Sequence, residues 1–453
     1  MTTIDDLNLS KDTAQAERAN RAKTFNYAVG MFGTSIPINL LKTYAAAYYV
    51  DKMGVPTNQW GLVLIFYTII DMIDNPIYGY LSDRTRSKWG RRRPWLVIGT
   101  PLLVLGLIAF FATPGFLAGN SLLAWAALFY VFTGTVDSLI NANYGALFPE
   151  LFPDDASRAK ANAMRQAFQL VAMIISIALT PVVAGKIGFG MTALVYGLIG
   201  GAVIMYMSLT SHEHLERLEE PKPVLWSSLK NLVSNPKFWI AGFTNAFYSG
   251  AMSLVMAGMP FYAKYTLGIS DLQTTIMFAT VLLVAIGAVA VWAYFVRRFD
   301  LMKVWRAAML TLAVAYVPMF FASSFVPALL AAILVGFGFA GVITTMDLVQ
   351  ARIMDEDYER NKVHREGIIS NALGFMNRLS ELFKGVGFML LFNLFAFESG
   401  DNPGPQPGMA AKFLLTIFPM VLMIIALIFS VFLRFPPRKG ENVSSERQES
   451  EVS

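Results

Sequence analysis

Seven charged side chains lie deep inside long apolar stretches of this chain, and they carry the clearest chemistry in the sequence. A charge at the centre of a bilayer costs about 2.5–3.5 kcal/mol, so such a side chain is paired, hydrated or used. The set comprises Lys42, Asp71, Asp74, Asp137, Arg378, Glu381 and Lys384. We expect these groups to bind ions or polar solutes, or to pair with one another.

Asp71 and Asp74 are three residues apart, which places both carboxylates on one side of a helix. Asn75 adds an amide oxygen beside them, and Ser138 adds a hydroxyl from another apolar segment. Carboxylate and neutral oxygens suit a small hard cation, and protonation of one carboxylate is the alternative. The competing interpretation is that both aspartates are packing partners of Lys42 or Arg378; a cation that displaces such a partner would couple binding to movement.

The sequence offers no constellation for covalent chemistry. It contains no Cys, and its three His lie in polar stretches, so we expect neither a thiol nucleophile, a disulfide, a zinc site nor a catalytic imidazole. We therefore predict that the chain is not an enzyme and needs no cofactor beyond a coupling cation.

The composition is that of a membrane protein. Of the 453 residues, 55% are hydrophobic and 15% charged, with a mean hydropathy of +0.51, whereas soluble chains carry about a quarter charged residues. The net charge of +5 reflects membrane topology rather than nucleic-acid binding. No short apolar signal precedes the first apolar segment, so we expect that segment to insert by itself.

Twelve stretches are long enough to cross a bilayer of about 30 Å. Six form a first set and six a second: 25–50, 58–81, 95–114, 120–145, 165–185 and 189–210, then 237–263, 272–296, 302–323, 327–350, 369–397 and 410–434. We predict a polar segment 1–24, a six-helix bundle 25–210, a linker 211–236, a second bundle 237–434 and a short tail 435–453.

Basic residues gather in alternate loops. Arg84, Arg158 and Arg297 lie in three such loops, while the other loops hold little beyond Lys52, Lys186, Lys264 and Lys412. The positive-inside rule then predicts a multi-pass protein of the cell membrane with both termini in the cytoplasm. The halves also echo each other, since 47–55 (AYYVDKMGV) resembles 260–269 (PFYAKYTLGI). Parallel six-helix repeats around a central cavity predict an all-α, twelve-helix major facilitator fold.

Two charged segments are candidate gates. The loop 79–94 holds an acidic residue among arginines, and this acid can latch neighbouring helices through a bidentate bond; the alternative is a purely topogenic basic loop. A second cluster, 355–366, can pair with the arginines or with Arg158 across the same face, unless it is a solvated loop. The predicted gate residues are Asp83, Arg84, Arg91, Arg92, Arg93, Asp355, Asp357 and Glu366.

Three motifs resemble one family, the glycoside–pentoside–hexuronide:cation symporters: DNPIYGYLSDRTRSKWGRRRPW (74–95), NANYGALFPEL (141–151) and MDEDYERNKVHREGIISNALGFMNRLSELFKG (354–385). The resemblance implies sugar transport coupled to Na⁺ or H⁺, with the cation site on the helix of Asp71 and Asp74. Here Asp74 and Asn75 are exchanged relative to the family order, which rotates the second carboxylate by about 100°. Arg378 occupies the family's cationic position, and we expect it to bridge the two halves.

The resemblance also implies a set of sugar ligands, from which this sequence departs. Two family carboxylates are replaced by Ser35 and Asn141, Tyr144 stands next to the expected aromatic position, and Arg165 matches a family arginine. Lys42 and Asp137 are additions. The predicted substrate-binding set is Ser35, Lys42, Asp137, Asn141, Tyr144, Arg165 and Arg378. An acidic sugar would suit the three cations among them.

The sequence thus predicts a cation:sugar symporter that works by alternating access. Its expected partners are a sugar or glycoside, a coupling cation and the lipid bilayer, without nucleic acid, and we expect a monomer. Two alternatives stay open: an uncoupled facilitator or exporter of the same fold, and a non-transporting membrane sensor.

Overall fold

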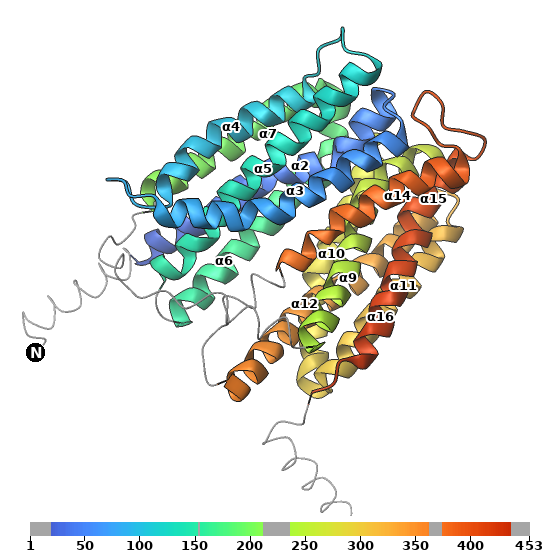
Figure 1. The fold of residues 1–453 in the computed structure, drawn as a ribbon. Helices are drawn as coiled ribbons and strands as arrows, with labels where there is room; N and C mark the ends of the chain where they lie inside the picture. The colour runs from blue at the N-terminus through green and yellow to red at the C-terminus, as the bar shows by residue number, and fades with distance from the viewer. Residues whose placement is uncertain (1–19, 153–154, 212–235, 362–373, 436–453) are drawn as a thin grey trace, which may run out of the picture.

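The structure is a computed structural model that describes residues 20–152, 155–211, 236–361 and 374–435. Within these ranges the chain forms helices and no strands, arranged as two bundles (Figure 1). The fold class predicted from the sequence is confirmed. The predicted terminal segments and linker lie almost wholly outside the described residues, and their boundaries stay predictions.

In the described residues, the first bundle contains six spans built from six α-helices and two π-helical segments. Its elements are α2 (Gly30–Ala46) with the π-helical end η1 (Ala47–Lys52), α3 (Thr57–Arg84), α4 (Arg93–Phe111), α5 (Gly119–Leu151), α6 (Asp155–Met173) with η2 (Ile174–Ala178), and α7 (Thr180–Thr210). Gly188 divides α7 with φ +79° and ψ 162°, a conformation open essentially only to glycine. The chain reverses there, so the fifth span ends and the sixth begins inside α7.

The second bundle repeats this plan. It comprises α9 (Pro236–Phe261) with η4 (Tyr262–Leu267), α10 (Asp271–Arg298), α11 (Leu301–Phe321), α12 (Phe325–Asn361), α14 (Leu379–Phe395), and a last span of α15 (Pro407–Lys412), η5 (Phe413–Ile417) and α16 (Phe418–Phe432). The similar segments 47–55 and 260–269 each contain a π-helical stretch, η1 and η4.

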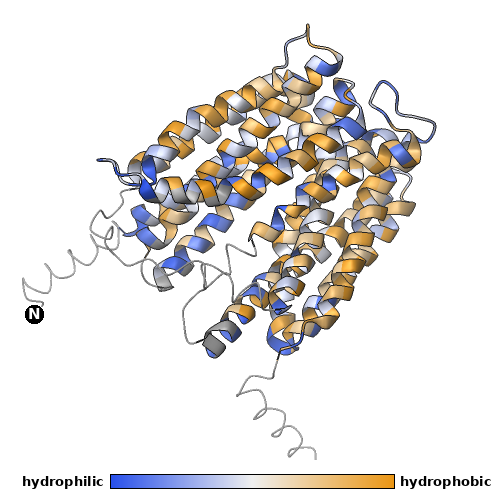
Figure 2. Ribbon diagram, in the orientation of Figure 1, coloured by the Kyte–Doolittle hydropathy of each residue, from blue (hydrophilic) through white to orange (hydrophobic). Residues whose placement is uncertain are grey.

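Hydrophobic residues predominate along the helices of both bundles (Figure 2). Phe66, Leu105 and Leu128 are each more than half exposed, which is favourable only against lipid. Seven helices in the described part are long and apolar enough to cross a membrane. The helices α2, α3 and α14 fall outside that group because they are short or carry polar groups toward the interior. These polar helices meet between the bundles.

The two bundles adjoin at one end of the molecule and diverge toward the other (Figure 1). We call the end that bears Asp51, Gly268 and Glu398 the loop face, and the end that bears residues 20, 84 and 435 the terminal face. At the loop face, Lys264 Nζ lies 2.8 Å from the Asp51 carboxylate, and Tyr265 also donates to Asp51.

The 396–406 loop reinforces this closure, because it joins the two halves through main-chain hydrogen bonds. Gly400 N donates to Val50 O at 2.9 Å, and Thr57 N donates to Glu398 O at 2.7 Å. One turn deeper, α3 and α14 approach so closely that a Cβ added to Gly385 would lie 2.8 Å from Gly61 O. The two bundles are therefore closed against each other at the loop face.

We expect Asp51→Asn to loosen this closure. Lys264 is 53% exposed in its side chain, so the ion pair is worth about 1 kcal/mol, and its loss shifts the open and closed populations about fivefold. The chain has no native cysteine. Spin labels can therefore be attached at Asn120→Cys and Ser323→Cys, which are exposed on the loop face in opposite halves. Double electron–electron resonance then reports the distribution of distances between the two labels. Lys264→Gln should produce the same shift without adding to it; independent, additive shifts would contradict the pairing.

Candidate functional site

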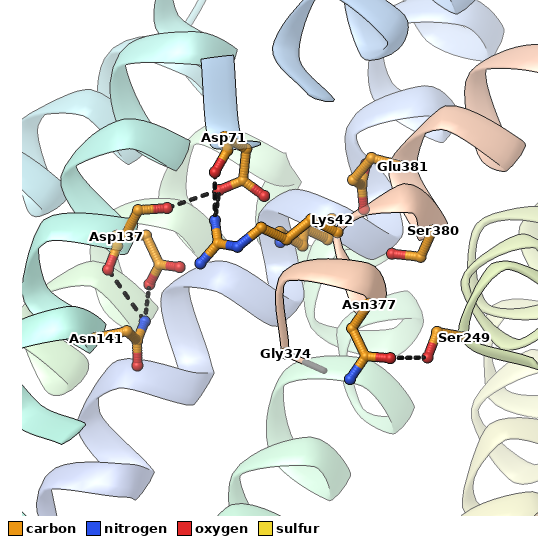
Figure 3. Close-up of a pocket in the computed structure, with 11 residues that line it drawn as sticks. Lys42, Asp71, Asp137, Asn141, Ser249, Gly374, Asn377, Ser380 and Glu381 are labelled. Carbon is orange, nitrogen blue, oxygen red and sulfur yellow. Dashed lines mark hydrogen bonds and ion pairs between the residues drawn. The ribbon is translucent and has the colours of Figure 1, made fainter. Parts of the chain in front are cut away.

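A polar cavity of about 390 Å³ lies between the two bundles (Figure 3). Helices α2, α3 and α5 of the first half contribute to it, as do α9 and the start of α14 in the second half. Its walls consist of charged, amide and hydroxyl side chains: Lys42, Asp71, Asp137, Ser138, Asn141, Ser249, Asn377, Arg378, Ser380 and Glu381, together with Gly374. Such a lining suits a polar solute rather than a lipid.

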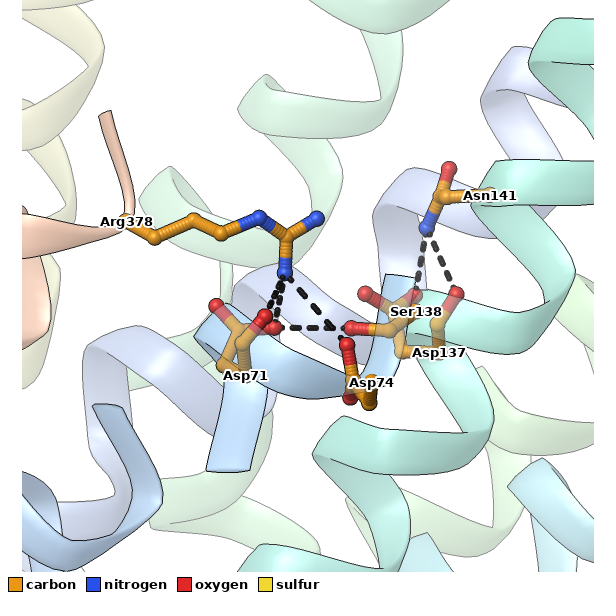
Figure 4. Close-up of polar contacts among 6 residues, drawn as sticks. All are labelled: Asp71, Asp74, Asp137, Ser138, Asn141 and Arg378. Atoms are coloured by element: carbon orange, nitrogen blue, oxygen red, sulfur yellow. Dashed lines mark hydrogen bonds and ion pairs between the residues drawn. The ribbon is translucent and has the colours of Figure 1, made fainter. Parts of the chain in front are cut away.

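An ion pair joins the two halves inside this cavity (Figure 4). Arg378 Nη1 contacts the carboxylate of Asp71 and also donates to the Asp71 main-chain oxygen at 2.8 Å. Asp74 Oδ1 lies 3.8 Å from the same nitrogen. The bridge predicted between Arg378 and the carboxylates of residues 71 and 74 is present, and it links α3 to the residue that caps α14.

The Asp71 carboxylate has a second ligand from the first half. Ser138 Oγ donates to Asp71 Oδ1 at 2.8 Å, so a hydroxyl from α5 and a carboxylate from α3 meet as the sequence predicted. Asp71 and Asp74 are 3% and 5% exposed. Burial makes the carboxylate charges expensive unless a cation remains beside them. The side chain of Asn75, the remaining predicted cation ligand, is not described.

A second buried cluster lies beside the first. Lys384 Nζ lies 2.7 Å from Glu381 Oε2, and Tyr130 donates to the same carboxylate at 3.0 Å. Lys384 also donates to Lys42 O at 3.1 Å, which ties α14 to α2. This pairing follows the i, i+3 spacing that the sequence showed. Lys42 itself lines the cavity, and its ammonium forms no ion pair within the described residues.

Two amide side chains stand on opposite walls of the cavity. Asn141 Nδ2 donates to Asp137 Oδ1 at 2.8 Å on the first half. Ser249 Oγ donates to Asn377 Oδ1 at 2.9 Å on the second half. Sequence reasoning named Asp137 and Asn141 but missed Ser249, Asn377 and Ser380, because a neutral polar residue in a helix is common and carries no large desolvation cost.

Comparisons with known proteins agree with this architecture. Residues 26–436 match the model of the MFS/sugar transport protein family. The chain belongs to that family. It is a membrane transporter and not an enzyme.

Among individual relatives of the transporter, the isoprimeverose transporter of Lactiplantibacillus pentosus is 25% identical over 78% of this chain and 76% of that protein. The uncharacterized symporter sll1374 of Synechocystis sp. is 30% identical over 54% of this chain, a match that spans only 46% of that protein. The crystal structure of the nucleoside transporter NupG shares the fold, with a TM-score of 0.69, 10% identity, and coverage of 91% of this chain and all of that one.

The other predicted substrate ligands of the transporter are not among the residues that line this cavity. Ser35 is 6% exposed within α2 and is not among the lining residues. Tyr144 and Tyr27 are stacked, and each hydroxyl donates to the main-chain oxygen of the other residue, at 3.1 and 2.9 Å. Arg165 lies over Tyr144 and Phe148, 5.1 Å from each ring centre. A role of these residues in substrate binding stays a prediction.

Three of the predicted gate residues form bonds within their own half. Arg91 Nη2 lies 2.7 Å from Glu150 Oε1, Arg92 contacts Ser82, and Arg93 donates to Ser208 O at 2.7 Å. These bonds fasten the 84–93 loop to α3, α5 and α7. Asp355 is exposed and Arg84 lies at the end of α3. The side chains of Asp83 and Asp357 are not described, and Glu366 lies outside the described residues, so the gate across the terminal face stays a prediction.

We expect Arg165 to act as a packing residue, and Arg165→Gln separates this from a substrate role. Loss of the cation over its aromatic rings should cost about 1–2 kcal/mol and lower the melting temperature of the purified transporter. The matched control is Arg298→Gln, because Arg298 stacks on Tyr294 at an exposed position and should matter little. An unchanged melting temperature combined with a large rise in the half-saturating substrate concentration would instead place Arg165 in the sugar site.

Proposed function

We propose that the transporter is a symporter that couples entry of Na⁺ or H⁺ to entry of a sugar or glycoside. The observation that carries the proposal is the Asp71–Arg378 ion pair, which lies in the cavity and joins the two halves that must move relative to each other. A site that binds a cation and also forms a contact between the halves can make conformational change depend on ion binding.

The formal charges around the cavity support a single monovalent cation. Three carboxylates and two basic groups line the cavity, which leaves one unbalanced negative charge. Asp74 contacts Arg378, and Lys384 contacts Glu381. With these two residues included, the set has four carboxylates and three basic groups, and the net formal charge is still minus one. One Na⁺ or one proton neutralises this set, and a buried set of charges is cheapest when neutral.

The ligand geometry supports a site at Asp71. Its carboxylate accepts from the Ser138 hydroxyl and contacts Arg378, while Asp74 lies on the same side of α3. A cation that takes the place of the guanidinium would find carboxylate and hydroxyl oxygens together, the ligand type that hard cations prefer. Displaced Arg378 is then available to the solute or to the movement of α14 away from α3.

The substrate proposal rests on the wall chemistry and on a relative. Amides, hydroxyls and carboxylates suit the hydroxyl groups of a sugar, and the relative from Lactiplantibacillus pentosus is named an isoprimeverose transporter. An acidic sugar stays an alternative because the ammonium of Lys42 lines the cavity without an ion pair in the described part. If the wild-type transporter takes up glucuronic acid and Lys42→Gln does not, the result would favour an acidic sugar as the substrate.

We place the transporter in the cell membrane with both termini in the cytoplasm, acting as a monomer. The orientation is supported by the concentration of basic residues in the loops of the terminal face. In that orientation the loop face is extracellular, so the conformation described here is closed to the outside and its bundles diverge toward the cytoplasm.

Counterflow in proteoliposomes tests the proposal. The panel is xylose, glucose, galactose, isoprimeverose and glucuronic acid, each measured with and without Na⁺ and across a pH gradient. We expect at least one neutral sugar to be exchanged, and its net accumulation to follow one cation gradient. Exchange that is indifferent to both gradients would identify an uncoupled facilitator or exporter, and an absence of exchange for the whole panel would refute sugar transport.

A further inference from the structure

The second half of the transporter contributes a polar pair to the cavity that the sequence did not single out. Ser249 lies in α9, and Asn377 lies just before α14. The Ser249 hydroxyl donates to Asn377 Oδ1 at 2.9 Å, and both residues line the cavity (Figure 3). A solute in the cavity can therefore reach both side chains, and the hydrogen bond from Ser249 fixes the orientation of the Asn377 amide.

The orientation of the Asn377 amide decides what it offers to a solute. Because the Ser249 hydroxyl occupies the amide oxygen, the Asn377 Nδ2 donors are turned away from Ser249 (Figure 3). On the other wall the bonding is reversed. Asn141 uses its Nδ2 for Asp137, which leaves the Asn141 oxygen as the group available for a new partner.

The two asparagine side chains therefore offer complementary groups on opposite walls. The Asn141 amide presents its oxygen, an acceptor, on the first half, whereas the Asn377 amide presents its Nδ2 donors on the second half. A hydroxyl group both donates and accepts, so a polyhydroxylated solute can satisfy both walls at once. An apolar solute would leave both walls unsatisfied at about 1–3 kcal/mol for each buried group.

We propose that the Asn377 carboxamide, held in position by the Ser249 hydroxyl, binds a hydroxyl group of the substrate and is a specificity-determining group of the second half. This inference rests on the proposed function and extends it to residues in α9 and ahead of α14. Ser249 acts as a positioning residue, since its bond is to Asn377. Because Asn141 and Asn377 belong to different halves, a solute that bonds both also joins the halves.

The test measures the half-saturating concentration in counterflow, with the panel sugar that the wild-type transporter exchanges fastest and with the monodeoxy derivatives of that sugar. We expect Asn377→Ala and Ser249→Ala to raise this concentration about threefold to tenfold, the effect of one hydrogen bond, while the maximal rate and the cation dependence are retained. Ser249→Thr keeps the hydroxyl and should restore the wild-type value.

The deoxy derivatives separate binding from a general structural defect. One derivative lacks the hydroxyl that meets Asn377, so the wild-type transporter should bind it less tightly than the parent sugar, whereas Asn377→Ala should bind both equally. Ser253→Ala is the matched control, because Ser253 lies one turn further along α9, is partly buried, and does not line the cavity. It should leave every value unchanged.

Two outcomes would overturn the inference. The first is an unchanged half-saturating concentration in both Ser249→Ala and Asn377→Ala. The second is an equal rise for the parent sugar and all its deoxy derivatives, which would mark a defect of packing. If the wild-type transporter exchanges none of the panel sugars, the proposed function itself fails and this inference fails with it.

Discussion

Asp71→Asn is expected to abolish sugar accumulation while leaving sugar exchange in place. Asparagine keeps a hydrogen-bond acceptor for Ser138 but removes the charge that attracts a cation. One elementary charge moving through 100 mV is worth about 2.3 kcal/mol, which corresponds to roughly fifty-fold accumulation at 1.4 kcal/mol per tenfold. The accumulation ratio in energised proteoliposomes should therefore fall from tens to about one.

Counterflow provides the control for folding, because exchange without a gradient needs the cavity but not the coupling. A matched conservative change is Asp300→Asn, since Asp300 caps α11 outside the cavity and asparagine caps a helix equally well. That variant should accumulate sugar as the wild type does. Concentrative uptake by Asp71→Asn would contradict the assignment of Asp71 to the cation site.

Gly385→Val is expected to disfavour closure of the loop face and to slow transport by about fivefold to 150-fold. A Cβ at this position would meet Gly61 O at 2.8 Å, Ile65 at 2.9 Å and Leu64 at 3.2 Å, and two of these neighbours are branched side chains on a packed helix. Overpacking costs typically about 1–3 kcal/mol, which converts into that range of rates if the closed conformation alone is affected.

The measurement combines sugar counterflow with distances from the spin-label pair on the loop face, where the fraction of open molecules should rise. Gly385→Ala should give a smaller effect in the same direction. Gly287→Ala serves as the control, since a Cβ added there meets nothing within 4 Å. A Gly385→Val transporter that exchanges sugar at the wild-type rate would show that the α3–α14 contact does not limit the cycle.

The sequence predicted the fold and the charged part of the site for one physical reason, the cost of burying a charge in lipid. That cost makes an aspartate such as Asp71 conspicuous in an apolar run, and it also predicts a partner, which proved to be Arg378. The same argument with helical spacing predicted the Glu381–Lys384 pair. Hydropathy located the spans for the same reason.

Other features carried no comparable signal. The fifth span was predicted over 165–185, whereas α6 begins at Asp155, because a helix that projects beyond the lipid needs no apolar residues in its first turns. Ser249 and Asn377 are neutral, so burial left no mark in the composition. Arg165 matched a family position, yet a sequence does not distinguish an arginine stacked on tyrosines from one that binds a solute.

The unbalanced negative charge of the cavity has a consequence for energetics across the membrane. Under the proposed symport of one monovalent cation with a neutral sugar, the formal charges of the loaded cavity sum to zero, whereas the unloaded transporter moves with one net negative charge. The resting potential of a cell, negative inside, then acts on the unloaded form and drives its reorientation toward the outside. The membrane potential would accelerate the return of the unloaded transporter to its outward-open form. It would have little effect on the inward movement of the loaded form.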